Sequence, residues 1–413
     1  MKRVLVVAYH FPPLAGSSGI QRTLRFVQHL PCFGWEATVL TCIPRAYENI
    51  KSDLLRDVPP RTSIVRAFAL DTARHLAIGG RYPEWLARPD RWVSWWPDAV
   101  LKGRAIVRRN DIDAIFTTYP IATAHLIGYS LSRASGLPWI ADFRDPMAQE
   151  GYPADPRTWT SFKRVEERAF SAAAACTFTT AGAARMYRDR YPASTAQIEI
   201  IENGYDEETF AEAQRERSAS EPLNGGVPTL VHSGIVYPQE RDPTQLFVAL
   251  ASLKGQGIDS TRLRIRFRAA VYDALLSELA TRHGVDDMIE IAPHVPYRAA
   301  LNEMFRADGL LILQAANCNE QVPAKLYEYL RVRKPIIALT AAEGDTAHAL
   351  KASGITSIAG LDTAEDIAAL LKRFASPDRD RMIANDAAIK RASRLHRAEE
   401  LAKLLDRVCR LSG

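Results

Sequence analysis

Short apolar runs rich in β-branched residues alternate with longer amphipathic stretches along the whole chain. The first half contains VLVVAY, EATVLT, IFTTY, PWIADF, CTFTT and IEIIE. The second half restarts the pattern with PTLVHSG, LRIRFRA, MIEIA, GLLILQ, PIIALT and ITSIAG. Apolar runs that alternate with helix-length segments are typical of parallel strands joined by crossover helices. We therefore predict an α/β protein with two parallel sheets.

The chain length and one break in the pattern predict where the two sheets separate. A single hydrophobic core rarely grows beyond about 250–300 residues, and this chain has 413. Around residues 205–225 the periodicity is lost, and Gly, Ser, Pro and charged residues accumulate. We predict an N-terminal domain over residues 1–205, a linker over 206–226 and a second domain over 227–376. Residues 377–413 are strongly helical, and we expect them either to cap the second domain or to pack back on the domain junction.

The composition indicates an ordinary globular protein in a reducing compartment. Apolar residues make up 47% of the chain and charged residues 24%, and the five cysteines include no C-x-x-C pair. Tyr9, His10 and two prolines interrupt the N-terminal apolar run, which favours a buried strand over a signal peptide. No stretch approaches the roughly 20 apolar residues that span a bilayer. We expect a cytoplasmic protein, either soluble or peripheral on the inner face of the membrane.

The charge is unevenly distributed between the two halves. Residues 1–205 contain 26 Lys and Arg against 19 Asp and Glu, whereas residues 206–413 contain 27 against 29. A basic excess of this size is common in soluble proteins, and it also suits contact with anionic lipid headgroups. No nucleic-acid-binding motif accompanies it, so nucleic acid is not an expected partner.

Residues 75–96 hold four of the seven tryptophans. Aromatic and basic residues together suit a membrane interface or a lipid-linked acceptor. Packing of these tryptophans on the N-terminal domain is an equally good explanation. Both interpretations stay open from the sequence.

The strongest local signal for chemistry lies between Glu320 and Pro335. Pro323 suits the first turn of a helix, because its missing N–H has no intrahelical partner there. A helix N-terminus favours a diphosphate, and Lys325 adds a full positive charge. Glu328, about one turn further along, is able to accept hydrogen bonds from two ribose hydroxyls. The segment therefore predicts a nucleoside diphosphate site, with a solvated helix residue as the alternative for Glu328.

Glu320 and Glu328 also have the E-x7-E spacing of retaining GT-B glycosyltransferases. The sequence K-x-x-E-Y-L…K-P-I-I around Glu328 is similar to glycosyltransferase family four. This resemblance implies the GT-B fold, in which two Rossmann-like domains face each other across a cleft. It also implies that Glu320 faces the donor sugar and that Glu328 binds the ribose. The E-G-F-G sequence of the family is here Glu320-Gln321-Val322-Pro323, without glycines.

A second stretch, LVHSGIVYPQERDP, resembles the first strand and loop of the family's C-terminal domain. The resemblance implies that Gly234 permits close backbone approach and that Arg241 reaches the diphosphate. The second cation that the family commonly supplies a few residues later is replaced here by Lys325 or Arg268. Arg268 ends the run LRIRFRA, where ligands gather in open α/β sheets. A strand-edge arginine without a ligand is an equal alternative for this residue.

The N-terminal stretch YHFPPLAGSSGIQRTLRF predicts a strand, a glycine-containing loop and an amphipathic helix. Gly16 and Gly19 allow the loop to approach a ligand closely. The stretch lacks G-x-G-x-x-G, so a nicotinamide cofactor is disfavoured. It resembles the F-P-P…G-G…R opening of family-four enzymes, which implies an acceptor loop formed by Gly16, Gly19 and Arg22. A surface-helix position explains Arg22 equally well.

The segment PWIADFRDP places Asp142, Arg144 and Asp145 at the end of a predicted strand. The D-F-R-D-P sequence resembles a variant found in a subgroup of the family. A carboxylate there is suited to orient or deprotonate the acceptor hydroxyl. Alternatively, one of the two aspartates pairs structurally with Arg144. The candidate catalytic residues are therefore Asp142, Asp145 and Glu320.

The resemblance implies transfer of a hexose-type sugar from a nucleotide diphosphate sugar to an acceptor glycan, with retention of configuration. It places such an enzyme in cell-surface polysaccharide or glycolipid assembly, where the acceptor is in some cases lipid-linked. We predict no cofactor and no metal, because cations and a helix N-terminus can stabilise the departing diphosphate. Two alternatives stay open: a GT-B sugar-nucleotide epimerase and a non-catalytic protein that binds a sugar nucleotide.

Overall fold

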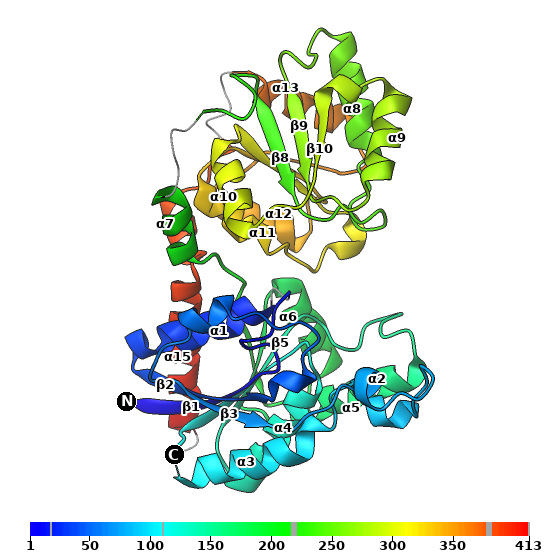
Figure 1. The fold of residues 1–413 in the computed structure, drawn as a ribbon. Helices are drawn as coiled ribbons and strands as arrows, with labels where there is room; N and C mark the ends of the chain where they lie inside the picture. Colours follow the sequence, from blue (N-terminus) through cyan, green and yellow to red (C-terminus); the bar gives the residue numbers. More distant parts are fainter. Residues whose placement is uncertain (17–18, 110, 216–220, 377–381, 412–413) are drawn as a thin grey trace. The chain divides into compact units, whose positions relative to one another are not determined.

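The computed structural model describes residues 1–16, 19–109, 111–215, 221–376 and 382–411. The chain folds into two compact units (Figure 1). Unit 1 consists of Met1–Asn203 together with Arg394–Gly413, and unit 2 consists of Gly204–Ser393. Each unit is built on one parallel sheet.

The sheet of unit 1 has seven strands in the order β3-β2-β1-β4-β5-β6-β7, all parallel. The strands are β1 (Lys2–Val7), β2 (Trp35–Cys42), β3 (Ser63–Ala67), β4 (Ala114–Thr118), β5 (Trp139–Arg144), β6 (Ala175–Phe178) and β7 (Gln197–Ile200). Along β1, Val4 and Val6 belong to one hydrophobic cluster, whereas Leu5 and Val7 belong to another. A strand that is buried on both faces has a continuous apolar sequence, which explains the run VLVVAY.

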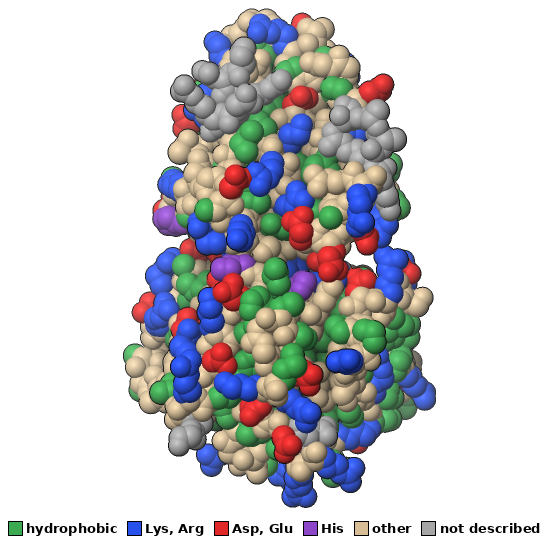
Figure 2. All heavy atoms as spheres, turned by 90° about the vertical axis from the view of Figure 1, so that its left-hand side faces the viewer, with side chains coloured by type: hydrophobic (Ala, Val, Ile, Leu, Met, Phe, Trp, Pro, Cys, Tyr) green, Lys and Arg blue, Asp and Glu red, His purple; other side chains and the backbone are tan. Residues whose placement is uncertain are grey.

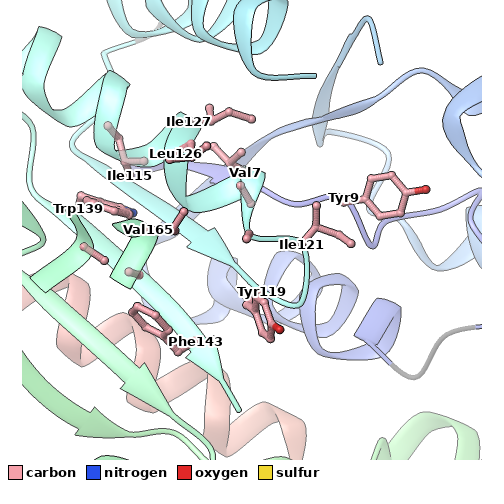
Figure 3. Close-up of a cluster of buried hydrophobic side chains, with 14 of the residues drawn as sticks. Val7, Tyr9, Ile115, Tyr119, Ile121, Leu126, Ile127, Trp139, Phe143 and Val165 are labelled. Carbon is pink, nitrogen blue, oxygen red and sulfur yellow. The ribbon is translucent and has the colours of Figure 1, made fainter. Parts of the chain in front are cut away.

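Helices cover both faces of this sheet. They are α1 (Gly19–His29), α2 (Thr72–His75), α3 (Trp95–Arg109), α4 (Thr123–Ser135), α5 (Pro156–Ala172), α6 (Ala181–Arg190) and α15 (Arg394–Leu411), with 3-10 turns η1 (Leu30–Phe33), η2 (Pro44–Ala46), η3 (Asp53–Asp57) and η4 (Glu84–Ala87). α1 and α15 pack together over one face of the sheet. α3, α4 and α5 contribute to the cluster on the other face, where Ile115 and Trp139 of the sheet lie beside Ile127 of α4 (Figure 3).

The sheet of unit 2 has six strands in the order β10-β9-β8-β11-β12-β13, also parallel. The strands are β8 (Thr229–Ser233), β9 (Arg264–Arg268), β10 (Ile289–Ala292), β11 (Gly309–Leu313), β12 (Ile336–Leu339) and β13 (Ile358–Ala359). The helices are α7 (Glu207–Arg215), α8 (Thr244–Gly255), α9 (Asp273–His283), α10 (Tyr297–Arg306), α11 (Lys325–Val332), α12 (Asp345–Ala352), α13 (Ala364–Phe374) and α14 (Asp386–Arg391), with 3-10 turns η5 (Asp286–Met288) and η6 (Ala316–Cys318). Leu311 and Leu313 belong to one hydrophobic cluster, and Leu310 and Ile312 to another. This sheet is therefore also buried on both faces.

The predicted α/β class with two Rossmann-like parallel sheets is confirmed. Each of the twelve apolar runs quoted above overlaps a strand. The sequence analysis missed β3, which has the sequence SIVRA and lies at one edge of the sheet. Its residues are only partly buried apart from the last one, so polar residues interrupt its apolar pattern.

The residues predicted as a linker and as a closing helix belong to different units. α7, within the expected linker, packs in unit 2. The rings of Phe210 and Phe305 meet edge to face with their centroids 6.0 Å apart, and Glu212 forms an ion pair with Arg298. α15, within the expected closing segment, packs in unit 1. Residues 216–220 and 377–381 of these two segments lie outside the described residues.

The tryptophans of residues 75–96 divide into two pairs. Trp95 is fully buried in the core of unit 1. Trp92 packs against the same core, and its Nε1 donates a hydrogen bond to the Ala46 carbonyl oxygen at 3.3 Å. The side chains of Trp85 and Trp96 are 69% and 39% exposed. Packing therefore explains Trp92 and Trp95, and only the other pair is available to an interface.

Basic and acidic side chains are interspersed over the face of the molecule that Figure 2 shows. The basic excess of unit 1 is therefore not concentrated on that face. In the described part of the chain, none of the helices combines the length and the apolar character needed to cross a membrane.

Candidate functional site

Ligands of open α/β sheets gather beyond the carboxyl ends of the strands, at the point where the strand order reverses. This point lies between β8 and β11 in unit 2, and between β1 and β4 in unit 1. Gly234 follows β8 and Gln314 follows β11. His10 and Tyr119 follow β1 and β4 closely in unit 1. Several of the predicted site residues lie at these two edges.

Gly234 makes room for Lys325 at the end of β8. Gly234 has a φ of +125°, which residues with a side chain rarely adopt. A Cβ atom at this position would collide with Nζ of Lys325. The same Nζ donates a hydrogen bond to the Ser233 carbonyl oxygen. Burial, and then the charge of Arg241, lower the pKa of Lys325 to about 7. An ammonium held in this way at a strand end is suited to bind an anion.

Arg241 supplies a second cation at the same edge. Its Nη1 donates a hydrogen bond to the Ile235 carbonyl oxygen at 2.5 Å, and its guanidinium carbon lies 5.2 Å from the centre of the Tyr237 ring. These contacts fix the side chain. Among the described residues, none accepts a hydrogen bond from Nε or Nη2 of Arg241. A diphosphate would relieve the repulsion between this guanidinium and Lys325.

Helix α11 places Glu328 in its first turn, as the sequence predicts. The helix begins at Lys325, so Pro323 lies two residues before it and not within its first turn. The Tyr297 hydroxyl donates a hydrogen bond to Oε1 of Glu328 at 2.7 Å. The hydroxyl of the fully buried Tyr329 accepts a hydrogen bond at 3.0 Å from the N–H of the last residue of β8. α11 is thereby tied to the strand that precedes Gly234.

Glu320 lies exposed on a loop that Gln314 holds in place. The Gln314 side chain is only 4% exposed, and its Nε2 donates hydrogen bonds to the carbonyl oxygens of Cys318 at 2.7 Å and of Gln321 at 2.8 Å. The Thr346 hydroxyl donates to the same Gln321 oxygen at 3.0 Å. The backbone is therefore fixed on both sides of Glu320. The sequence analysis missed Gln314, although a polar residue directly after a buried strand is a usable signal.

Arg268 is fully engaged within unit 2. Its Nε and Nη2 donate to the two carboxylate oxygens of Glu303 at 2.8 and 2.6 Å, and its Nη1 donates to the Pro293 carbonyl oxygen at 2.6 Å. Arg266 also donates to Glu303, at 2.8 Å. This arrangement matches the alternative of a strand-edge arginine without a ligand. Of the two candidates for the second cation, Lys325 has the more suitable geometry.

His10, Gly19 and Arg144 come together at the edge of unit 1. A Cβ atom on Gly19 would lie 2.8 Å from Nη1 of Arg144 and would collide with Nδ1 of His10. Arg144 has a φ of +62°, and its Nη1 donates to the Tyr119 carbonyl oxygen at 3.3 Å. Burial, and then the charge of Arg144, lower the pKa of His10 to about 4, so its imidazole is neutral at pH 7. Gly16 has a φ of +82°, and residues 17–18 lie outside the described part.

Asp142 and Arg22 form a buried ion pair, which differs from both roles predicted for them. Their side chains are 0% and 3% exposed. Nε and Nη2 of Arg22 donate to the two carboxylate oxygens at 3.0 and 2.9 Å, and this guanidinium also donates to two carbonyl oxygens that follow β7. The hydroxyls of Thr118 and Thr177 complete the shell of Asp142 at 2.8 and 2.7 Å. Arg22 is thus not a surface residue, and Asp142 pairs with Arg22 instead of Arg144.

Asp145 is the more open of the two predicted aspartates. It lies directly after β5 and is exposed. One hydroxyl, that of Thr179, lies 3.4 Å from its Oδ1. Asp145 therefore has a carboxylate that is accessible from solvent at the carboxyl edge of the sheet.

Residues 18–204 match a protein family described as "Glycosyl transferase 4-like domain". The match begins directly before α1 and ends four residues after β7, so it covers most of the part of unit 1 that precedes unit 2 in the sequence. These residues form a glycosyltransferase 4-like domain. The predicted resemblance to family four of the GT-B enzymes is thereby confirmed.

Solved structures extend the likeness of the glycosyltransferase to the whole chain. HepE of Anabaena in complex with UDP-glucose has a TM-score of 0.63 and 13% identity, over 98% of this chain and 100% of that chain. A sucrose-phosphate synthase from Thermosynechococcus elongatus has a TM-score of 0.60 and 14% identity, over 99% of each chain. An α,α-trehalose 6-phosphate synthase from Burkholderia multivorans has a TM-score of 0.65 and 12% identity, over 100% of each chain. At these identities the likeness establishes the fold of the glycosyltransferase and nothing finer. No curated protein matches it in sequence.

Proposed function

We propose that this glycosyltransferase transfers a hexose from a nucleoside diphosphate sugar to an acceptor hydroxyl, with retention of configuration and without a metal ion. The observation that carries the proposal is the edge of unit 2, where Lys325 and Arg241 lie near the first turn of α11. Structures of the similar protein HepE contain UDP-glucose, UDP, and UDP with glucose. Retention is proposed because the chain resembles family four.

In the proposed reaction the bond between the anomeric carbon and the diphosphate oxygen breaks, and a bond to the acceptor oxygen forms. Negative charge then accumulates on the departing diphosphate. Lys325, Arg241 and the positive end of the α11 helix dipole are preorganised to stabilise that charge. Glu328 would bind the ribose hydroxyls, and Glu320 would face the transferred sugar. These donors supply the positive charge for which other enzymes use a metal.

The acceptor is proposed to bind at the edge of unit 1, where Gly16 and Gly19 shape the loop. There Asp145 would accept the proton of the attacking hydroxyl. Asp142 would act indirectly, because it holds Arg22 and the end of β5 in place. The acceptors we favour are glycans of cell-surface polysaccharide or glycolipid assembly, at the cytoplasmic side of the membrane. A similar trehalose-phosphate synthase from Burkholderia xenovorans was solved in complex with glucose-6-phosphate.

A panel of nucleotide sugars, incubated with free and lipid-linked glycan acceptors and followed by mass spectrometry, tests the proposal. A product that is heavier than the acceptor by one hexose, with release of the nucleoside diphosphate, is the expected result. Conversion of the donor sugar without any acceptor would indicate the epimerase alternative. Donor binding without turnover for any pair would indicate a protein that only binds sugar nucleotides.

Glu328→Ala is expected to weaken nucleoside diphosphate binding by about 100-fold or more. The reason is that each hydrogen bond from a ribose hydroxyl to an ionised carboxylate contributes about 1.5–3 kcal/mol. Calorimetric titration of the purified variant measures the loss. Tyr297→Phe is the matched control, because it removes the hydroxyl bonded to Glu328 and keeps the carboxylate. Unchanged affinity in Glu328→Ala would remove the ribose role.

Donor binding is expected to become weaker as the pH rises above 7. Lys325 has a pKa of about 7 in the free protein, and a bound diphosphate raises it by favouring the charged form. Binding above pH 7 therefore requires uptake of a proton, and affinity falls by up to about tenfold per pH unit. UDP-glucose titrations from pH 6 to 9 measure this, since its esterified diphosphate does not titrate in that range. Lys325→Met should bind more weakly, without the pH dependence. A flat profile for the unmodified protein would contradict the role of Lys325.

A further inference from the structure

One side of α5 carries a stripe of basic residues that the proposed transfer reaction does not use. Arg157, Arg164 and Arg168 are exposed, and they follow one another at spacings of seven and four residues. Because residues at such spacings share one face of a helix, the three guanidinium groups line the same side. Ser161, four residues after Arg157, lies on that face as well.

This face of α5 borders a groove of about 470 Å³ in unit 1. The residues that define the groove include Arg88, Trp96, Leu126, Arg157, Arg164 and Arg168. Thr160 and Ser161 add hydroxyl groups to its wall. The groove thus combines four arginines and two hydroxyls with an apolar side.

The charge in this groove is of one sign. Its lining contains no Asp or Glu among the described residues. Arg88 is already paired with Glu84 at 2.5 Å and lies 3.6 Å from Asp155. Within the described ranges, neither Arg157 nor Arg164 has an ion-pair partner. Arg157 and Arg164 therefore line the groove without a carboxylate partner, which favours an anionic ligand.

The apolar side of the groove is fixed, and two exposed apolar residues precede Arg88 in the sequence. Nε1 of Trp96 donates a hydrogen bond to the Ser130 hydroxyl at 2.9 Å, which sets the orientation of its ring. Trp85, in the turn η4 next to Arg88, is 69% exposed, and Ile78 is 87% exposed. Aromatic side chains next to arginines are typical of surfaces that lie at a membrane interface.

We propose that this groove binds the phosphate group of an anionic membrane lipid. The planar guanidinium groups of Arg157 and Arg164 match the geometry of phosphate oxygens. Trp96 and Leu126 would then lie against the apolar part of the same lipid. The groove runs along α5 from Arg157, in its first turn, to Arg168, and a helix that follows a parallel strand begins at the carboxyl edge of the sheet. The membrane surface would therefore lie near the edge that carries Asp145. This inference does not depend on the proposed transfer reaction.

Sedimentation of the full chain with lipid vesicles tests the inference. We expect it to sediment with vesicles that contain phosphatidylglycerol and not with pure phosphatidylcholine, and to be released by salt as the attraction is screened. Each arginine near an anionic surface strengthens binding about fivefold. The variant Arg157→Gln, Arg164→Gln, Arg168→Gln should therefore lose about 100-fold in vesicle affinity.

The matched control replaces Arg104, Arg108 and Arg109 by Gln. These three arginines are exposed in the second half of α3, so the control removes the same charge from unit 1 away from the groove. It should retain most of the vesicle affinity. Equal losses in the two variants, or no sedimentation of the unmodified chain, would overturn the inference.

Two further measurements separate the groove from other sites. In the first, inorganic diphosphate is tested for protection of α5 from hydrogen exchange. Protection by diphosphate in a protein that does not bind vesicles would indicate a soluble phosphate ligand and overturn the membrane assignment. UDP-glucose affinity should be the same in the groove variant and the unmodified protein. Failure of donor binding in the unmodified protein would contradict the proposed function and leave the vesicle result intact.

Discussion

Asp142→Ala is expected to lower the free energy of unfolding by about 3–5 kcal/mol, which is the cost of leaving a buried charge without its partner. The partner is Arg22, whose side chain is 3% exposed and donates to both carboxylate oxygens. Burial by itself raises the pKa of Asp142, but the charge and hydrogen bonds of Arg22, together with the Thr177 hydroxyl and the charge of Arg144, outweigh burial and lower this pKa below its usual value. The stabilisation is therefore present above the unfolded-state pKa and is lost as the pH falls below it.

Urea unfolding, monitored by hydrogen exchange of the peptides that contain β5, measures the stability of unit 1 separately from that of unit 2. The double variant Arg22→Met, Asp142→Ala should recover part of the loss, because it removes the unpaired guanidinium together with the carboxylate. Glu48→Ala is a control for an ordinary surface pair, since Glu48 and Arg91 are both substantially exposed and such a pair contributes about 0–1 kcal/mol. A loss in Asp142→Ala no larger than in this control would contradict the structural role.

The strands could be predicted because most of them are buried on both faces. A strand such as β11, with the sequence GLLIL, forms a continuous apolar run without polar residues. The run is too short for a typical helix, so its length identifies it as a strand. β3 could not be predicted by the same rule, because it lies at the sheet edge with its first residues partly exposed. The edge position depends on the strand order, which a local pattern does not contain.

The partners of charged side chains could not be predicted. Arg22 and Asp142 are 120 residues apart in the chain, and Arg268 and Glu303 are 35 apart. Arg268 lies at a strand end as predicted, whereas Asp142 lies within β5 and not just after it. A predicted strand end also does not specify whether a side chain faces solvent or a buried partner. The same limit applies to the tryptophans, because Trp95 and Trp96 are adjacent and only Trp96 is exposed.

The geometry at the carboxyl edge of the sheet of unit 2 could be predicted better, because it depends on the local backbone. Gly234 is predicted to let another group approach its backbone closely. In the structure that group is the side-chain ammonium of Lys325. Glu328 was placed in the first turn of a helix, where it lies. Gln314 was missed because its role depends on a loop closing back on it, which only the folded chain reveals.

Arg241→Ala is expected to slow sugar transfer by about 10²–10³-fold, the usual cost of removing one preorganised donor from a developing negative charge. Arg241 is suited to this role because Ile235 and Tyr237 fix its guanidinium. Loss of the Arg241 guanidinium weakens contact with the bound diphosphate, and it weakens contact with the departing diphosphate in the transition state even more. The rate constant for transfer should therefore fall together with diphosphate affinity. The fold should change little, because Arg241 has no carboxylate partner among the described residues.

Arg268→Ala is the matched comparison for Arg241→Ala, since both residues lie near the carboxyl edge of the same sheet. Arg268 bonds Glu303 through two nitrogens, so its removal should lower stability and leave diphosphate affinity nearly unchanged. Thermal melts, titration with UDP and with uridine, and transfer rates with the donor found by the panel separate the two variants. Arg241→Ala should weaken UDP binding and spare uridine, because only UDP carries the diphosphate. Equal losses for UDP and uridine in Arg241→Ala, or full transfer activity, would contradict the assignment of Arg241 to the leaving group.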